Sequence, residues 1–434
     1  MRVPVLVSLL AGAVFPASAG LLNSSALDPS LFRVTQFTTG LPFPGGMAIT
    51  PDGGFLVATS PGYSSGAILR FTDQNLDGFA DGPGVAVFSG SGGPYTSLVY
   101  TGKYWLVAEE LANKYVLLQP GANPTDPYTV AGELQVQFQS FPWLHPTEGA
   151  TVAPVAGNPN QIDVFFNVGS EFNDALSSTN ATLSGMGLSP VSIAGDSLYR
   201  IRIDQGGASP VVVGGPVQIA TGIRNVYGFA YDATNGNLYF ADNAIDALVD
   251  PWTSPPPQAD ELNVLTALQL AGGVVNFGYP TCYIQYLTGA AVGSGCQMPL
   301  AVFQPVNGNR SEGPAGVALA PPGFPAGFNS GLFVGFYGYD GGPVNDQNAL
   351  VFYSLGTGQY LHFIESANPL TGAPINLYSS SDSLFVADFL TGDVWQITAT
   401  GVPEPGNTAL VLVAILGFGW FRLLSSSEKR RCRR

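Results

Sequence analysis

Residues 228–243 read GFAYDATNGNLYFADN, and the pattern of this stretch recurs along the chain. A small residue and apolar residues are followed by a turn with Gly, Asn or Asp, and then by a β-rich run that ends in Ala or Gly. Strand-length runs of this kind predict small antiparallel sheets, and one such sheet cannot bury its apolar face alone. Diverged copies of the pattern occupy residues 47–71, 97–119, 149–204, 316–355 and 375–398.

Six copies predict an all-β fold, a six-bladed β-propeller that spans residues 33–400. The chain is rich in glycine (55) and proline (35), as many tight turns between apolar strands require. A propeller gathers loops from every blade at one mouth, so residues far apart in the sequence can share a site there.

Residues 1–19 have the features of an export signal. Arg2 is followed by an apolar run and by the small residues Ala17-Ser18-Ala19, which are typical of a signal-peptide cleavage site. We therefore expect a signal peptide over residues 1–19 and an exported mature protein.

Residues 402–434 join a Pro-Glu-Pro element to an apolar run at 409–424 and a basic tail. The run predicts a transmembrane segment with the arginines on the cytoplasmic side. This order resembles the PEP-CTERM sorting signal of bacteria that use an exosortase. The resemblance implies a transient inner-membrane anchor, processing by an exosortase-type enzyme, and a destination at the cell surface, outer membrane or extracellular matrix. A plain membrane anchor is the alternative.

The net charge is −15, and the chain between the two terminal segments is more strongly acidic still. Such a field repels nucleic acid and anionic lipid, so we exclude nucleic-acid binding. Cys282 and Cys296 form an even pair in the exported part of the chain, which predicts a disulfide.

The segment TDQNLDGFADGPG has the spacing of a calcium-binding loop. Gly78 stands at the sharp turn, and Gly84 stands where a bidentate glutamate would be expected. We predict calcium here, with a solvated Asx-rich turn as the alternative. The expected ligands are Asp73, Asn75, Asp77, the Phe79 carbonyl and Asp81.

The stretches RNVYGF, ADELNVL and NFGYP follow one another between residues 224 and 280. They resemble the glucose/sorbosone dehydrogenase family, six-bladed propellers that depend on pyrroloquinoline quinone (PQQ). HPTEGATV, VFFNVGSEFN and the closing SLFVADFLTGDVWQIT are similar to further family segments in the right order. The resemblance implies oxidation of a sugar or polyol with PQQ and calcium.

Carried over by position, the resemblance makes His145 the general base and places Arg224 and Asn225 on the quinone. An imidazole suits the role of base because its pKa lies near neutrality. Asp242, Asn243 and Glu261 match the segment whose oxygens bind calcium in relatives. From residue type alone, His145 is an ordinary loop histidine, and the second histidine, His362, lies on a predicted strand and is structural.

Several positions depart from the family pattern. Val226 replaces a proline, Ser311 replaces a histidine, and neither lysine of the exported part lies in a late blade. PQQ is a tricarboxylate, and a channel opening with net negative charge binds it poorly. The alternative function is therefore a catalytically degenerate propeller that binds carbohydrate or protein in an extracellular polysaccharide matrix.

Overall fold

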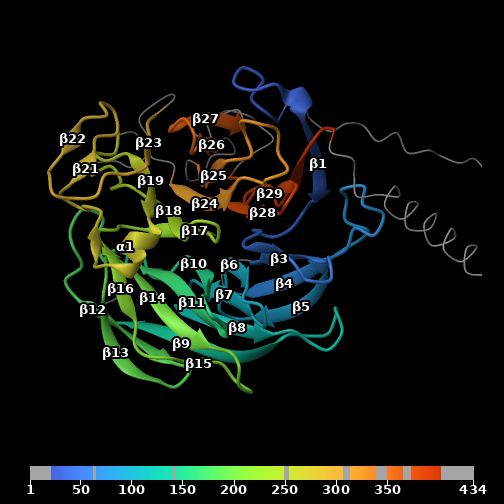
Figure 1. The fold of residues 1–434 in the computed structure, drawn as a ribbon, viewed down its shortest axis with the longest axis horizontal. Helices are drawn as coiled ribbons and strands as arrows, with labels where there is room; N and C mark the ends of the chain where they lie inside the picture. The colour runs from blue at the N-terminus through green and yellow to red at the C-terminus, as the bar shows by residue number, and fades with distance from the viewer. Residues whose placement is uncertain are drawn as a thin grey trace, which may run out of the picture.

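The computed structural model describes residues 21–61, 65–139, 143–248, 254–305, 313–338, 349–364 and 373–401. Within these ranges the chain forms six antiparallel blades around a central axis (Figure 1). The prediction of an all-β, six-bladed propeller is confirmed. The expected signal peptide and the sorting segment at 402–434 lie outside the described residues. Among the described residues, no helix is long and apolar enough to cross a membrane.

Each blade is built on four strands, and inserted strands extend two of the six sheets to six strands. In blades 1 to 5 the first strand in the sequence lies nearest the axis. Blade 1 contains β2 (Met47–Ile49), β3 (Phe55–Thr59), β4 (Gly66–Phe71) and β5 (Val85–Gly90). Blade 2 contains β6 (Tyr95–Tyr100), β7 (Trp105–Glu109), β8 (Lys114–Gln119) and β9 (Thr129–Phe138). Blade 3 contains β10 (Ala150–Val155), β11 (Asn158–Val168), β14 (Ser197–Asp204) and β16 (Val217–Thr221).

The second half of the ring follows the same order until its last strand. Blade 4 contains β17 (Val226–Asp232), β18 (Asn237–Asp242), β19 (Asp260–Leu265) and β23 (Ala301–Phe303). Blade 5 contains β24 (Pro314–Leu319), β25 (Gly331–Phe336), β26 (Leu350–Ser354) and β27 (Gln359–Ile364). Blade 6 contains β28 (Asn376–Ser379), β29 (Ser383–Ala387), β30 (Val394–Ala399) and, as its outer strand, β1 (Phe32–Thr38).

The N-terminal strand β1 closes the ring. It pairs antiparallel with β30, from Phe32 opposite Ala399 to Thr38 opposite Val394. Figure 1 shows this blue strand beside the red C-terminal strands. The first and last parts of the propeller therefore share one sheet, and β1 completes the four strands of blade 6.

The remaining elements are insertions at the edges of the blades. β12 (Asn180–Gly185) and β13 (Leu188–Ala194) come from the chain of blade 3 but extend the sheet of blade 2. The others are β15 (Val211–Val212), β20 (Val275–Asn276), β21 (Tyr283–Ile284), β22 (Ala291–Val292), helix α1 (Ala267–Ala271) and the 3₁₀ turn η1 (Pro29–Leu31). A disulfide joins Cys282 to Cys296 beside β21 and β22, at the predicted pair.

Small residues let the six inner strands approach one another around the axis. A Cβ atom on Gly149 would overlap the carbonyl oxygen of Tyr227, and one on Gly228 would overlap that of Ala315. Gly316 packs in the same way against Ile375 of the next blade. These contacts join the beginnings of neighbouring inner strands, so the strands run in the same direction. We call the end where they begin the upper end of the channel.

Two of the interblade contacts use polar side chains in place of glycine. The Ala150 amide of β10 donates to Ser97 Oγ of β6 at 3.0 Å. Asn376 Nδ2 of β28 donates to the Pro44 carbonyl before β2 at 3.4 Å. Farther from the axis, apolar side chains fill the space between blades, as Leu56 and Ile68 of blade 1 do with Trp105 of blade 2. Burial of these side chains supplies most of the favourable free energy of the fold.

We predict that Gly228→Ala destabilises the protein by roughly 1–3 kcal/mol, because the added methyl group forces β17 away from β24. Urea unfolding followed by circular dichroism measures this difference. Gly215→Ala is the matched control, since a Cβ at Gly215 meets no atom within 4 Å. Equal stability of the two variants would contradict close packing of the inner strands.

Candidate functional site

The upper end of the channel brings together the residues that the sequence predicts for the site. His145 precedes β10, and Arg224 and Asn225 precede β17, so all three lie where inner strands begin. Gly169 and Ser170 follow β11 and lie between them. The His145 amide donates to the Ser170 carbonyl at 3.0 Å, and the Ser170 amide donates to the Arg224 carbonyl at 2.8 Å. The segments that carry His145 and Arg224, about eighty residues apart in the sequence, are therefore both hydrogen-bonded to Ser170.

Gly169 is the point of closest approach between the two segments. A Cβ built on it would lie 2.9 Å from the Arg224 carbonyl oxygen and 2.9 Å from His145 Cβ. Any other residue would push the histidine and the arginine apart. The glycine of the VFFNVGSEFN stretch thus sets the spacing of the site.

The His145 imidazole has one nitrogen beside a carboxylate and one without a partner. Nδ1 lies 3.7 Å from Glu148 Oε1. Nε2 is buried and has no hydrogen-bond partner among the described residues. The Glu148 carboxylate fixes the orientation of the ring, which leaves Nε2 to accept a proton from a bound group.

Glu148 also faces a second carboxyl group, that of Glu110. Burial and the nearby charge of Glu148 raise the pKa of Glu110 to about 8. Two acids that share one site cannot both ionise at low cost, so Glu110 holds a proton near neutral pH. Neither acid was singled out from the sequence, although Glu148 stands three residues after His145 in HPTEG.

The Arg224 guanidinium is enclosed by two loops. Its Nη2 donates to Asn173 Oδ1 at 2.8 Å and to Asp246 Oδ2 at 2.5 Å, and its Nε donates to the Asn173 carbonyl at 3.2 Å. The Arg224 side chain is 1% exposed, whereas that of Asp246 is 49% exposed. The cation is therefore buried beneath a carboxylate that lies at the surface.

Asn225 and Asn243 carry unpartnered oxygen atoms beside this arginine. Asn225 is 3% exposed, and the Asn243 amide donates to its carbonyl at 2.9 Å. The side-chain Oδ1 atoms of both residues are buried and have no partner among the described residues. Buried polar atoms are rarely left unpaired in native proteins, so these atoms point to a group that binds at the upper end.

Asp242 and Glu261 form a buried carboxyl pair just behind Asn225. They lie opposite each other on β18 and β19. The Asn225 amide donates to Asp242 Oδ1 at 2.7 Å. Burial, with the charge of Glu261 added, raises the pKa of Asp242 well above its usual range. Burial also raises the pKa of Glu261 to about 7.

The described residues contain no group of three or more His, Cys, Asp and Glu side chains placed to hold a metal ion. The predicted set Asp242, Asn243 and Glu261 includes two such side chains and one amide. Gln258 Oε1 and Asn263 Oδ1, whose amide nitrogens donate to Glu261 at 3.4 and 3.3 Å, are buried and unpartnered. The Glu261 carboxylate therefore accepts from two amide N–H groups, whose own amide oxygens have no partner among the described residues.

The Asp-rich loop between β4 and β5 lies at the other end of the blade, where β4 ends. Its acids hold the loop closed: Asp73 Oδ2 accepts from the Gly78 amide at 2.9 Å, and Asp81 Oδ2 accepts from the Gln74 amide at 2.7 Å. Asp77 Oδ1 accepts from the Phe79 amide at 2.9 Å, and Asn75 Nδ2 donates to Asp77 Oδ2 at 2.9 Å.

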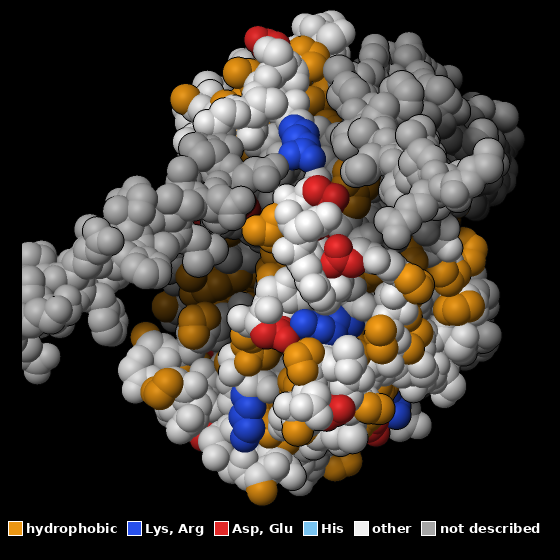
Figure 2. All heavy atoms as spheres, turned by 90° about the vertical axis from the view of Figure 1, so that its right-hand side faces the viewer, with side chains coloured by type: hydrophobic (Ala, Val, Ile, Leu, Met, Phe, Trp, Pro, Cys, Tyr) orange, Lys and Arg blue, Asp and Glu red, His pale blue; other side chains and the backbone are white. Residues whose placement is uncertain are grey.

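These bonds do not test the predicted calcium site at Asp73, Asn75, Asp77, Phe79 and Asp81, which stays a prediction. The carboxylates accept from the loop's own N–H groups, and among the described residues they do not form a metal-binding cluster. Figure 2 views this side of the ring, where acidic and basic side chains lie scattered among uncharged ones. The alternative, an Asx-rich turn, describes the loop as the structure has it.

His362 lies on β27, away from the upper-end site. Its ring packs edge-on against Tyr360 with 5.9 Å between ring centres, and burial lowers its pKa. The structure thus separates the two histidines of the chain, as expected.

The comparisons with known proteins support the fold. No family model matches the chain, and no curated protein matches it. Among solved structures, the holo PQQ domain of pyranose dehydrogenase from Coprinopsis cinerea is 16% identical, with a TM-score of 0.55 over 85% of this chain and 95% of that one. The PQQ-bound aldose sugar dehydrogenase from Streptomyces coelicolor is 16% identical, with a TM-score of 0.52 over 86% of this chain and 99% of that one.

A third solved structure is the calcium structure of a carbohydrate-active enzyme from Trichoderma reesei. It is 16% identical, with a TM-score of 0.55 over 86% of this chain and 96% of that one. The chain therefore has the propeller fold that is found in quinoprotein sugar dehydrogenases.

We predict that the stability of the protein falls as the pH rises from about 5 to 9. The pKa of Glu110 is higher in the folded protein than in the unfolded chain, so the unfolded chain loses this proton at a lower pH. The free energy of unfolding therefore falls as the pH rises between the two pKa values. Glu110→Gln, which cannot ionise, should lessen this fall. Melting temperatures measured at each pH test it. Glu133→Gln, at a side chain 47% exposed, is the control. If the melting temperature of Glu110→Gln fell with pH as steeply as that of the wild type, the raised pKa of Glu110 would be refuted.

Proposed function

We propose that the upper end of the channel oxidises a hydroxyl group of a sugar or polyol, with PQQ as the electron acceptor and calcium as a second cofactor. The observation that carries the proposal is His145 Nε2, which is buried and unpartnered on a ring oriented by Glu148. It lies at the same end of the channel as Arg224 and Asn225. The propeller fold of known quinoprotein sugar dehydrogenases supports the same conclusion.

Arg224 and Asn225 would hold the quinone at this position once the exposed Asp246 moved away from the buried guanidinium. A guanidinium matches a carboxylate in a forked geometry, and Asp246 contacts Arg224 through a single oxygen, Oδ2. The buried amide of Asn225 has an unpartnered atom to hydrogen-bond a polar ring. When bound, the quinone would accept a hydride from the sugar carbon.

The protein's part in the reaction is the transfer of a proton. His145 Nε2 accepts the proton of the sugar hydroxyl, and the resulting imidazolium is stabilised by the Glu148 carboxylate beside Nδ1. Glu110 remains protonated near neutral pH and so adds no second negative charge at this point. The imidazole returns its proton to solvent after the product leaves.

Calcium prefers carboxylate and amide oxygens, and Asp242, Asn243 and Glu261 would supply them once the N–H groups that face the two carboxylates gave way. Asp242 and Glu261 would supply the charge, and Asn243 Oδ1 would supply a neutral ligand. A cation between the two acids would remove their mutual repulsion. We propose this position for calcium, with the Asp-rich loop as the alternative.

Replacement of His145 should stop turnover and leave cofactor binding intact. We expect His145→Ala to lower kcat by about 10²–10⁴-fold, the usual contribution of a general base. Dye reduction with aldoses and polyols, after reconstitution with PQQ and calcium, measures kcat, and the quinone absorbance measures binding. His362→Ala is the matched control. Equal loss in both variants, or loss of quinone binding in His145→Ala, would exclude the assigned role.

Calcium should raise the melting temperature of the apoprotein, since it would bind only the folded state. Glu261→Gln should abolish this increase, whereas Asp77→Asn in the Asp-rich loop should preserve it. Scanning calorimetry with and without added calcium measures both effects. A calcium shift lost in Asp77→Asn but kept in Glu261→Gln would place the ion in the loop.

The contact between Arg224 and Asp246 favours a second function, a propeller that binds carbohydrate or protein without oxidising it. A neutralised guanidinium attracts a tricarboxylate less strongly, while neutral hydroxyl groups are unaffected. Export through residues 1–19 and sorting through residues 402–434 would place such a protein in a bacterial extracellular matrix. Binding to the host polysaccharide without any quinone binding would decide for this function.

A further inference from the structure

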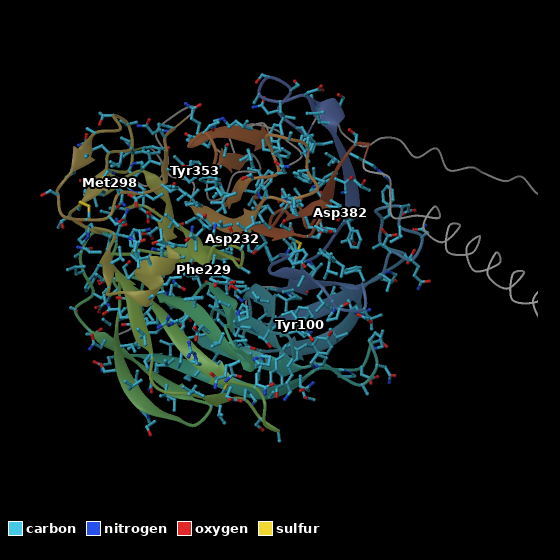
Figure 3. The ribbon with its side chains drawn as sticks, in the orientation of Figure 1. Tyr100, Phe229, Asp232, Met298, Tyr353 and Asp382 are labelled. Carbon is cyan, nitrogen blue, oxygen red and sulfur yellow. A yellow bond between two sulfur atoms is a disulfide. The ribbon has the colours of Figure 1, made fainter. Side chains whose placement is uncertain are left out.

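A cavity of about 780 Å³ occupies the channel below the upper-end site. All six inner strands line it, and it continues to the rim where β6, β17 and β28 end. Figure 3 shows Phe229, Asp232 and Tyr100 on the inner part of the ring. His145, Arg224 and Asn225 are not among its described lining residues. We call it the lower cavity.

The lower cavity is almost free of charge. Among its described lining residues, Asp232 is the single ionisable acid or base of the Asp, Glu, Lys, Arg and His types. Asp232 Oδ1 accepts from the Thr234 amide at 2.9 Å, and Oδ2 accepts from Asn235 Nδ2 at 2.7 Å. Its carboxylate is thus committed to the turn after β17. In a chain of net charge −15, an uncharged cavity of this size selects neither cations nor anions.

Two kinds of side chain line the lower cavity. Aromatic residues come from three of the inner strands, and their rings also pack between the blades, as Phe229 does against Phe240 and Tyr231 against Phe165. They are Tyr100, Tyr227, Phe229, Tyr231 and Tyr378. Hydroxyl and amide groups gather toward the rim: Thr234, Asn329, Ser330, Ser379, Ser380 and Ser381. Aromatic faces provide apolar contact area, while hydroxyls and amides provide both donors and acceptors.

We propose that the lower cavity is a second binding site, for a neutral oligosaccharide. A saccharide has apolar C–H faces that pack on aromatic rings and hydroxyl groups that pair with serine, threonine and asparagine. A wholly apolar ligand would bury the polar rim without partners, which costs free energy. The volume lies within the usual range for small-molecule sites. This site is separate from the upper end and needs neither quinone nor calcium.

Isothermal titration calorimetry of the full chain with cellotriose and maltotriose tests the proposal. We expect at least one trisaccharide to bind and Phe229→Ala to weaken it about tenfold or more. Tyr100→Ala, at a side chain 36% exposed, repeats the test at the rim. Phe172→Ala, an exposed aromatic beyond the lining of the lower cavity, is the matched control and should bind as wild type.

The upper-end variant His145→Ala separates this proposal from the proposed oxidation. Trisaccharide binding that persists in His145→Ala and weakens in Phe229→Ala and Tyr100→Ala supports the lower cavity, whether or not the protein has dehydrogenase activity. Absence of trisaccharide binding at millimolar concentration overturns the proposal. Binding that is lost in His145→Ala and unchanged in Tyr100→Ala also overturns it, because it assigns the saccharide to the upper end.

Discussion

The close contact of neighbouring inner strands is the constraint on which the rest of the structure depends. Where Gly149, Gly228 and Gly316 face the backbone of the next blade, no side chain fits between the strands. These contacts bring the loops before β10 and β17 to one end of the channel. The distance between a histidine and an arginine from different blades is therefore a consequence of backbone packing, and it needs no direct bond between the two side chains.

The same ring has two ends of opposite character. The upper end concentrates ionisable groups: His145 lies beside Glu148, which faces Glu110, and Arg224 lies beside Asp246, with the Asp242 and Glu261 pair behind them. The lower cavity has one carboxylate, which is bonded to its own turn. Charged groups that are costly to bury are thus gathered where chemistry can use them, whereas the lower end offers neutral contacts.

The repeat predicted the fold because each copy carries its own strand periodicity and its own small residue at the start of the inner strand. The closure by β1 was not predicted, since Phe32–Thr38 resembles any edge strand and its partner β30 is more than 350 residues away. Likewise, β12 and β13 extend a blade other than their own, and local sequence carries no sign of that pairing.

The site was predictable only as far as residue types and order allowed. His145 and Arg224 could be chosen from the family resemblance, and they do lie at one end of the channel. Asn173, Asp246 and Glu110 could not, because their contacts join loops of different blades. The Asp73–Asp81 spacing predicts calcium, but it could not show that N–H groups of the same loop donate to these carboxylates in the folded chain.

A crystal structure of the protein soaked with PQQ and calcium tests the central claim most directly. The account predicts quinone density at the upper end, in contact with Arg224 and Asn225 and within reach of His145 Nε2. Quinone density confined to the lower cavity, or an upper end in which Asp246 still covers Arg224 and no quinone has bound, would contradict it.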